Sequence, residues 1–326
     1  MRHIRLLVLI ALAAGLAPLA PWTAAPAVAW APAQDPDRQM ALGISMRDLT
    51  LRRLDAFTAE VGPAPAITMV WRHWWWKGKR GQFPALQLLD GIIERGSIPM
   101  ITWEPFDPDH RTDPRFDPPR ITAGEWDAYI RSFARAAASW GKPVLIRFMH
   151  EMNQGWHPYS ALWGDNTPED LIALWRHVRD LFREEGATNA FFVWCPSRRL
   201  NADATLASLY PGDEWVDYLG LDGYEPRGKS LSMADVFAPA YDAIGALSSK
   251  PIIISETGSP NALNKAAWVA AGYEAVYRRF PAVVAIVYFN HRMTTGVDFT
   301  LYTPPAAIEE YAGLLTQERF QGRFTP

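Results

Sequence analysis

Cysteine is almost absent from this chain. Cys195 is the only one among 326 residues, so no internal disulfide can form and the fold must be stabilised by its hydrophobic core. A large excess of one charge is also lacking, because 32 Lys and Arg stand against 35 Asp and Glu, a net charge of −3. Because there is no basic surplus, we expect neither nucleic acid nor anionic lipid as a partner. We also expect a monomer.

Long hydrophobic runs are missing after residue 29. Before it, Arg2 and Arg5 precede the apolar run LLVLIALAAGLAPLA, and the small-residue triplet AVA follows at 27–29. These are the three parts of a secretory signal peptide. We therefore expect residues 1–29 to be removed on export, which predicts a secreted protein with no membrane association after cleavage.

A membrane anchor is the competing interpretation of the same run. Pro18 and Pro21 interrupt it, and no second run reaches the length of a membrane span. We expect a flexible leader at residues 30–40 to follow the signal peptide. Residues 41–326 are then long enough for one large domain.

Eight short apolar runs recur along that domain, most of them rich in β-branched or aromatic residues. They are ALGISM, AITMVW, IPMITW, PVLIRFMH, FFVWCP, VDYLGLD, PIIISE and VVAIVYFN. Runs of this kind are typical of strands that are buried on both faces. Helical patterns lie between most of them, so the sequence predicts a single (β/α)8 barrel rather than an open doubly wound sheet.

Several helices have recognisable ends. Thr122 with Glu125 has the spacing of a capping box, and Gly141 has the position of a C-terminal stop. Thr167 and Ser232 are expected N-caps of later helices. Inserted length is concentrated after the second, third and fourth strands, where loops of a barrel build the face that carries chemistry.

Two glutamates follow predicted strands at that face. His150 and Glu151 end the fourth strand, and Glu256 ends the seventh. Cleavage of a glycosidic bond needs one carboxyl group to protonate the departing oxygen and a second to attack or support the sugar carbon. The pair predicts a glycosidase, with the two carboxyl groups about 5 to 5.5 Å apart if the reaction retains configuration.

The stretch HEMNQGWHPY resembles the acid/base motif of glycoside hydrolase family 26, a family of retaining β-glycosidases with a barrel fold. ISETG resembles the segment that carries the family's nucleophile, and VWCPS and LGLDGY extend the resemblance. It implies that Glu151 is the general acid/base and Glu256 the nucleophile. One position departs from the pattern, since Gln154 stands where mannan-cleaving members usually have glycine.

The resemblance implies a β-linked polysaccharide or oligosaccharide as substrate and no cofactor. Endo-β-1,4-mannan is the first choice, because cleavage of mannan is the commonest activity in the family. A mixed-linkage β-glucanase, a β-1,3-xylanase, a hydrolase that trims an exported bacterial polysaccharide, and a non-catalytic carbohydrate-binding barrel stay open as alternatives. Mannose differs from glucose in one configuration, so a single hydrogen bond could decide between them.

Other polar residues near the two glutamates are expected in the site. Tyr224 is the expected donor to Glu256, and Asp222 is expected to bind a sugar hydroxyl or to orient His150. Arg147 has the strand parity to face the same side, where its charge would hold carboxylates ionised, although it could equally be a buried structural ion-pair partner. His150 could instead be a core histidine bound to a backbone carbonyl.

Aromatic residues at strand ends suit sugar rings, which stack on them. We expect Trp103, Trp156 and Trp194 to line the site, and Trp74 to Trp76 to be loop packing or outer sugar platforms. Burial against Trp156 and the charge of Glu256 should both raise the pKa of Glu151. Cys195 has no neighbouring base in the sequence and is expected to be a buried filler.

A zinc metalloprotease is the remaining alternative for His150-Glu151. Its signature needs a second histidine at position 154, which is Gln154 here, and it needs a helix where this segment has the pattern of a strand. We therefore expect no metal.

Overall fold

The computed structural model describes residues 38–326. The expected signal peptide at 1–29 lies outside this range, and so does the expected leader except for residues 38–40. Within the described part of the chain, no helix has the length and hydropathy needed to cross a membrane.

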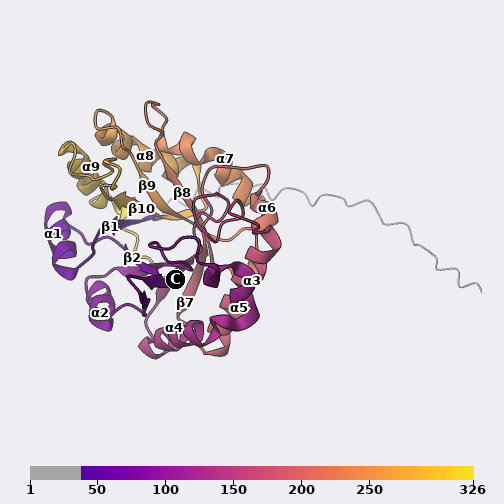
Figure 1. Ribbon diagram of the computed structural model, residues 1–326. Helices are drawn as coiled ribbons and strands as arrows, with labels where there is room; N and C mark the ends of the chain where they lie inside the picture. Colours follow the sequence, from indigo (N-terminus) through magenta and orange to yellow (C-terminus); the bar gives the residue numbers. More distant parts are fainter. Residues whose placement is uncertain (1–37) are drawn as a thin grey trace, which may run out of the picture.

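Eight parallel strands of the described chain close into a barrel, as the sequence predicts (Figure 1). Their order around the barrel is β1-β10-β9-β8-β7-β6-β5-β2. The strands are β1 (Ala41–Met46), β2 (Ile67–His73), β5 (Ile98–Glu104), β6 (Val144–Phe148), β7 (Ala190–Trp194), β8 (Tyr218–Tyr224), β9 (Ile252–Gly258) and β10 (Val283–Asn290). Because neighbouring strands are parallel, all their carboxyl ends meet at one mouth.

A helix follows each barrel strand and packs outside it (Figure 1). These helices are α1 (Leu51–Val61), α2 (Leu86–Glu94), α4 (Asp127–Trp140), α5 (Pro168–Glu184), the short α6 (Leu206–Leu209), α7 (Met233–Gly245), α8 (Lys265–Arg279) and α9 (Ala306–Leu315). A further short helix, α3 (Pro118–Arg120), belongs to the long loop after β5.

Apolar side chains fill two separate layers. Met100, Leu145 and Ile253 belong to the layer inside the barrel, whereas Ile101 and Phe148 belong to the layer between strands and helices. Successive residues of a strand point to opposite faces, so a shift of one position decides which layer a side chain enters. The same alternation decides which strand residues can reach the mouth.

The expected helix caps are confirmed at three positions and wrong at one. Thr167 forms a capping box with Asp170 at the start of α5, Ser232 accepts a hydrogen bond from the Asp235 backbone at the start of α7, and Gly141 ends α4. Thr122 does not cap α4, because its hydroxyl donates to the Pro118 carbonyl while Glu125 pairs with an arginine. The chain makes an irregular helical turn there, and α4 begins later, at Asp127.

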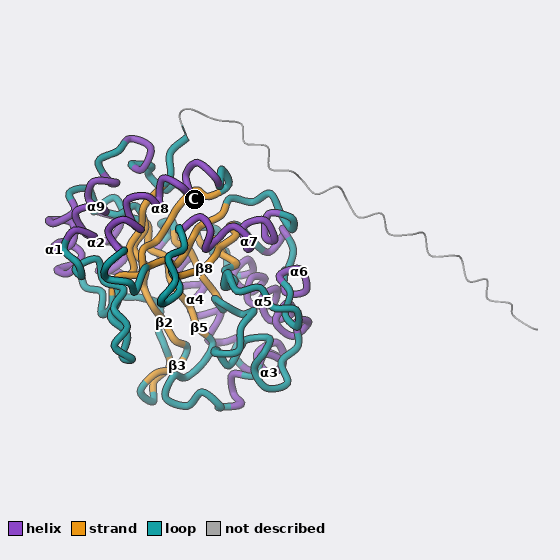
Figure 2. The backbone as a smooth tube through the Cα atoms, turned by 90° about the horizontal axis from the view of Figure 1, so that it is seen from above, coloured by secondary structure: helices purple, strands orange, loops and turns teal. Residues whose placement is uncertain are grey.

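The loop after β2 contains a small hairpin of β3 (Trp75–Trp76) and β4 (Lys79–Arg80). Lys77 and Gly78 join the two strands with φ of 50° and 71°, which is the positive-φ pair of a type I′ turn. Figure 2 shows this hairpin and α3 at one end of the barrel, with the C-terminus toward the other end. The inserted loops therefore lie at the mouth, as the sequence predicts.

Gly43 tests how closely the barrel interior is packed. A Cβ added there would lie 2.9 Å from Cβ and O of Ile67 and from Cγ2 of Val287, whereas one at Gly313 in α9 would meet no atom within 4 Å. We expect Gly43→Ala to lower the free energy of unfolding by about 1–3 kcal/mol. The matched control Gly313→Ala should raise it by about 0.5–1 kcal/mol. Urea unfolding measures both, and equal effects would contradict the close packing.

Candidate active site

Arg147 from β6 is the centre of the polar network inside the mouth. Its side chain has no exposed surface, and its Nη1 donates to Glu256 Oε1 at 2.7 Å and to Thr102 Oγ1 at 2.9 Å. Its Nη2 donates to Asp222 Oδ2, so one guanidinium bridges the ends of β8 and β9. The structure thus confirms that Arg147 faces the interior, where its charge favours ionised carboxylates.

Glu256 receives a hydrogen bond on each of its oxygens. Arg147 donates to Oε1, and the Tyr224 hydroxyl donates to Oε2. Burial, followed by the negative charge of Glu256, raises the pKa of Tyr224 well above its ordinary value, so its hydroxyl keeps the proton that it donates. The expected donor to Glu256 is therefore in place, and both contacts favour the ionised form of this carboxylate.

Glu151 lies in a tight turn directly after β6. Met149 and Glu151 both have positive φ, 46° and 55°, and the Glu151 backbone N–H donates to the Cys195 carbonyl at 2.7 Å. Such conformations are costly for residues other than glycine and are found where a site needs a side chain re-aimed. Trp156 Nε1 donates to Glu151 Oε2 at 2.6 Å, which fixes the carboxyl group.

Glu151 is a carboxyl group of the mouth that can hold a proton near neutral pH. Burial is the larger cause, and with the charge of Glu256 it raises the pKa of Glu151 to about 7, against the opposing effects of Arg147 and the hydrogen bonds from Trp156 and Ser197. The structure thus supports the raised pKa expected from the sequence. A protonated carboxyl beside a carboxylate is the pair of states that acid/base and nucleophilic roles require.

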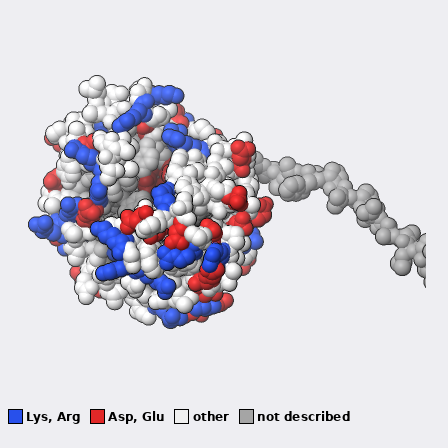
Figure 3. All heavy atoms as spheres, viewed as in Figure 1, with Lys and Arg blue, Asp and Glu red and all other residues white. Residues whose placement is uncertain are grey.

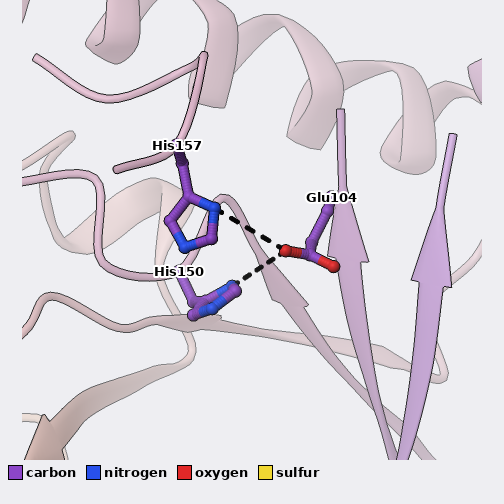
Figure 4. A group of neighbouring side chains, drawn as sticks. All are labelled: Glu104, His150 and His157. Atoms are coloured by element: carbon purple, nitrogen blue, oxygen red, sulfur yellow. Dashed lines mark ion pairs between the residues drawn. The ribbon is translucent and has the colours of Figure 1, made fainter. Parts of the chain in front are cut away.

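His150 lies between the catalytic carboxylates and a second cluster, with one ring nitrogen within 4.8 Å of a Glu256 oxygen. Figure 4 shows the rings of His150 and His157 directed at the carboxylate of Glu104, at the end of β5, with Nδ1 to Oε1 distances of 3.9 Å for both. His73 approaches the other oxygen, Oε2, with its Nδ1 at 2.8 Å. Tyr159 donates its hydroxyl proton to the His150 carbonyl at 3.1 Å.

The three histidines of this cluster differ in charge. Burial and the nearby Arg147 lower the pKa of His150 well below its ordinary value, and burial lowers the pKa of His157 to about 4. Burial also opposes protonation of His73, but the Glu104 carboxylate outweighs it and raises the pKa of His73. His73 and Glu104 therefore form the charged pair, and the other two rings act as neutral hydrogen-bonding groups.

Two groups of side chains in the described range bring possible metal ligands within 4.8 Å of one another. In the group of His150, Asp222 and Glu256, the guanidinium of Arg147 already binds both carboxylates and would repel a cation. The group of Glu104, His150 and His157 offers neutral imidazoles and a carboxylate, which are donors that Zn²⁺ accepts. His73 balances the charge of Glu104 without a metal.

Three expected site residues lie elsewhere than their predicted roles require. Trp103 and Trp194, with exposed fractions of 0% and 1%, belong to the layer between strands and helices. Trp103 stacks on Phe133 of α4, so strand parity turns it away from the mouth. Asp222 binds Arg147 and accepts a weak hydrogen bond from Cys195 Sγ at 3.2 Å. It is fully buried, and no hydrogen bond joins it to His150 within residues 38–326, so both expected roles of Asp222 are wrong.

The exposed fraction of each remaining side chain decides whether it can contact a sugar. Arg147 has no surface with which to touch a sugar and acts through the carboxylates, whereas Trp156 is 36% exposed and can contact one. Trp74 is buried packing, but Trp76 is 52% exposed and is free to meet a ligand. Cys195 is buried inside the barrel, where burial and the charge of Asp222 raise the pKa of its thiol, so the filler role is confirmed.

The sequence reasoning missed four residues of the mouth: Trp71, His73, Glu104 and His157. Trp71 presents an edge-on contact with the His150 ring at 5.5 Å. Parity could have found Glu104, because it follows Trp103 directly and must point to the opposite face. His73 ends β2 on the same face as Trp71, so parity could have found it too, whereas His157 reaches the mouth through the turn after β6.

A family model describes the central part of the chain. The model of Glycosyl hydrolase family 26 matches residues 129–260, which include both glutamates. Endoglucanase H from Acetivibrio thermocellus is 34% identical over 236 residues, 68% of this chain and 25% of its own length. A mannan endo-1,4-beta-mannosidase from Bifidobacterium adolescentis is 32% identical over 105 residues, 31% of this chain and 10% of its own. The chain thus spans a quarter or less of these curated relatives.

Solved structures share the fold over nearly the whole chain. A family 26 beta-mannanase from Bacteroides ovatus superposes with a TM-score of 0.64 and 17% identity, covering 88% of this chain and 92% of the other. At that identity the likeness establishes the barrel, and the sequence matches establish the relationship. With its closed (β/α)8 barrel, its match to the family model and its curated relatives, this chain belongs to glycosyl hydrolase family 26.

Proposed function

We propose that this protein is a retaining endo-β-glycanase in which Glu151 is the general acid/base and Glu256 the nucleophile. The observation that carries the proposal is the pairing of two unlike carboxyl groups at one mouth. The pKa of Glu151 is about 7, while Glu256 accepts hydrogen bonds from Arg147 and Tyr224 on its two oxygens. Such a pair separates the acid from the nucleophile before substrate binds.

In the first step, Glu256 attacks the anomeric carbon as the glycosidic bond breaks. Arg147 anchors Oε1, which leaves Oε2 beside Tyr224 as the attacking oxygen. Glu151 transfers its proton to the departing glycosidic oxygen, and a covalent glycosyl–enzyme ester remains. The ester carries no charge on Glu256, so the repulsion that raised the pKa of Glu151 disappears.

In the second step, Glu151 acts as a base. Its carboxylate takes a proton from water, the water oxygen attacks the anomeric carbon from the face that the leaving group vacated, and the bond to Glu256 breaks. Two displacements restore the original configuration. Glu151 ends the cycle protonated and Glu256 ends it as a carboxylate, which are their starting states.

A β-1,4-linked mannan is our first candidate substrate, and the curated mannanase relative supports it. A β-glucan is the second, because an endoglucanase shares 34% identity over two thirds of this chain. The two sugars differ only at carbon two, so contacts in one subsite decide between them. Product analysis after incubation with mannan, lichenan, cellulose and xylan should show oligosaccharides from one of the first two, and release of single sugars alone would exclude endo action.

Export is part of the proposal and depends on the sequence of residues 1–29. A secreted polysaccharide hydrolase meets its substrate outside the cell. Sequencing the N-terminus of the protein recovered outside the cytoplasm should find Trp30 first.

Substitution of the two glutamates distinguishes their roles. We expect Glu256→Ala to abolish cleavage of every substrate, and Glu151→Ala to lose least on an activated aryl glycoside, whose leaving group needs no proton. Azide should restore turnover to Glu151→Ala and yield a β-glycosyl azide. Glu310→Ala, on the exposed face of α9, is the control and should keep full activity. Equal losses for both variants on natural and activated substrates would contradict the assignment.

The pH dependence of kcat/KM tests the electrostatic coupling. Glu151 must be protonated for the first step, so activity should fall as pH rises through about 7, its pKa in the folded protein. In Glu256→Gln the neighbouring charge is gone, so the pKa of Glu151 should fall. Titration of Glu151 by NMR in both proteins measures this directly. An unchanged Glu151 pKa would show that the two groups are not coupled.

A further inference from the structure

A cavity of about 750 Å³ adjoins the catalytic turn through Trp71 and is not used by the proposed mechanism. Most of its walls come from the end of β1 and the segment after it, the end of β2, and the β3–β4 hairpin, and Leu88 of α2 and His291 after β10 complete them. Trp71 also lines it and contacts His150 of the catalytic turn edge-on. The cavity is therefore an extension of the mouth on the side of β1 and β2, and not a separate site.

The wall of this cavity is unusually rich in positive charge. Five of its lining residues are cationic and one is acidic, in a chain whose net charge is −3. The cations are Arg47, Arg72, Lys77, Lys79 and Arg80, and the acid is Asp48. Figure 3 views the face of Figure 1, which is hollowed near its centre and carries Lys and Arg side chains at the edge of the hollow.

Most of these cations lack an acidic partner. Asp48 lies 3.9 Å from Arg47 and also from Arg53, which is outside the cavity wall. Within residues 38–326, no ion pair within 4.0 Å involves Arg72, Lys79 or Arg80. An unneutralised cluster next to a cleft attracts an anionic ligand and favours its binding.

Arg72 is the cation that is most enclosed. Its side chain is only partly exposed, and burial lowers its pKa from the ordinary value. Among the residues that the structure describes, Arg72 makes one hydrogen bond, from Nη1 to the Trp71 carbonyl at 2.7 Å, although a guanidinium has five N–H donors. A carboxylate in the cavity would accept two parallel hydrogen bonds from such a planar group, and its charge would offset the cost of burial.

The hairpin presents three of the other cations, Lys77, Lys79 and Arg80, on a fixed backbone. Its type I′ turn, Lys77-Gly78, suits the twist of the two strands. At its base, Gly81 donates its N–H to the Trp74 carbonyl at 2.8 Å, and a Cβ at Gly81 would lie 2.1 Å from the His73 carbonyl oxygen. Since Trp74 is buried, the hairpin is held against the core and its charges are positioned before a ligand arrives.

Aromatic surface accompanies the charge. Trp71 and Trp76 both line the cavity, and Lys77 Nζ lies 4.5 Å from the centre of the Trp76 ring. Aromatic faces stack on sugar rings, whereas an inorganic anion has no apolar face that could stack on them. The combination of aromatic surface and unpaired cations selects a ligand that is both a sugar and an acid.

We propose that this cavity is a subsite for an acidic sugar, a uronic acid unit whose carboxylate binds the guanidinium of Arg72. The proposal rests on the proposed glycanase function and specifies its substrate class further, as a β-glycan that carries carboxylate groups. Lys79 and Arg80 add attraction from the hairpin, and the neutral part of the glycan continues past Trp71 to Glu151 and Glu256.

The test compares one oligosaccharide in two forms. A short β-1,4-linked oligosaccharide with one glucuronic acid unit is measured against the same compound after its carboxyl group has been reduced to an alcohol. We expect the wild type to favour the acidic form in kcat/KM by about tenfold, the effect of one charge-assisted bidentate contact. The preference should decrease as salt concentration rises.

Substitutions in the cavity wall show which residues cause the preference for the acidic oligosaccharide. Arg72→Gln should remove it, and Arg72→Lys should restore only part of it, because an ammonium lacks the planar fork. The exposed pair Lys79→Gln/Arg80→Gln should weaken it without affecting folding. Arg323→Gln removes one exposed charge at the opposite end of the chain's barrel and should leave the preference unchanged. Circular dichroism and the urea midpoint of unfolding confirm that each variant is folded.

Each outcome separates this proposal from the proposed function. Equal kcat/KM for the two oligosaccharides, or a preference for the neutral one, overturns the acidic subsite while leaving the glycanase intact. Free sulfate that competes as well as the acidic oligosaccharide also overturns it, because the cavity would then be a simple anion site. If no glycan is cleaved but calorimetry finds Arg72-dependent binding of the acidic form alone, the glycanase fails and the subsite stands.

Discussion

One buried guanidinium determines how the mouth of this barrel is organised. Arg147 has no contact with solvent, yet it binds carboxylates at the ends of β8 and β9 and a hydroxyl on β5. A buried charge of this kind is tolerated only when opposite charges and hydrogen bonds surround it. Its position therefore fixes Glu256 and Asp222, and through its field it limits how far the pKa of Glu151 can rise.

The position of Arg147 also helps to explain why similar side chains of the mouth have different pKa values. Arg147 bonds directly to Glu256 and reaches Glu151 only through space, and burial with the charge of Glu256 raises the pKa of Glu151 to about 7. The neighbouring cluster repeats this division with histidines. The Glu104 carboxylate outweighs burial and raises the pKa of His73, whereas burial, followed by the charge of Arg147, lowers the pKa of His150. The charge state of each histidine thus depends on its burial and on the charged group beside it.

The sequence predicted the barrel and the two glutamates because both depend on local order. Apolar runs define strands, and a polar residue at the carboxyl end of a parallel strand must lie at the mouth. It misplaced Trp103 and Trp194, because the residue type alone does not show on which face of a strand the side chain lies. It missed His73 although that residue ends β2, and it missed His157 because the turn at Met149 and Glu151 depends on tertiary contacts. Their positive φ values leave no mark in the sequence.

Cys195 has a practical consequence for work on this protein. It is the only cysteine, it lies inside the barrel against Asp222, and its thiol keeps its proton. Thiol reagents react with exposed thiolates, so the native chain offers them no target. A cysteine introduced at an exposed position such as Lys77, on the hairpin tip, would then be the single labelled site. A fluorophore attached there would report on the hairpin without first removing a native residue.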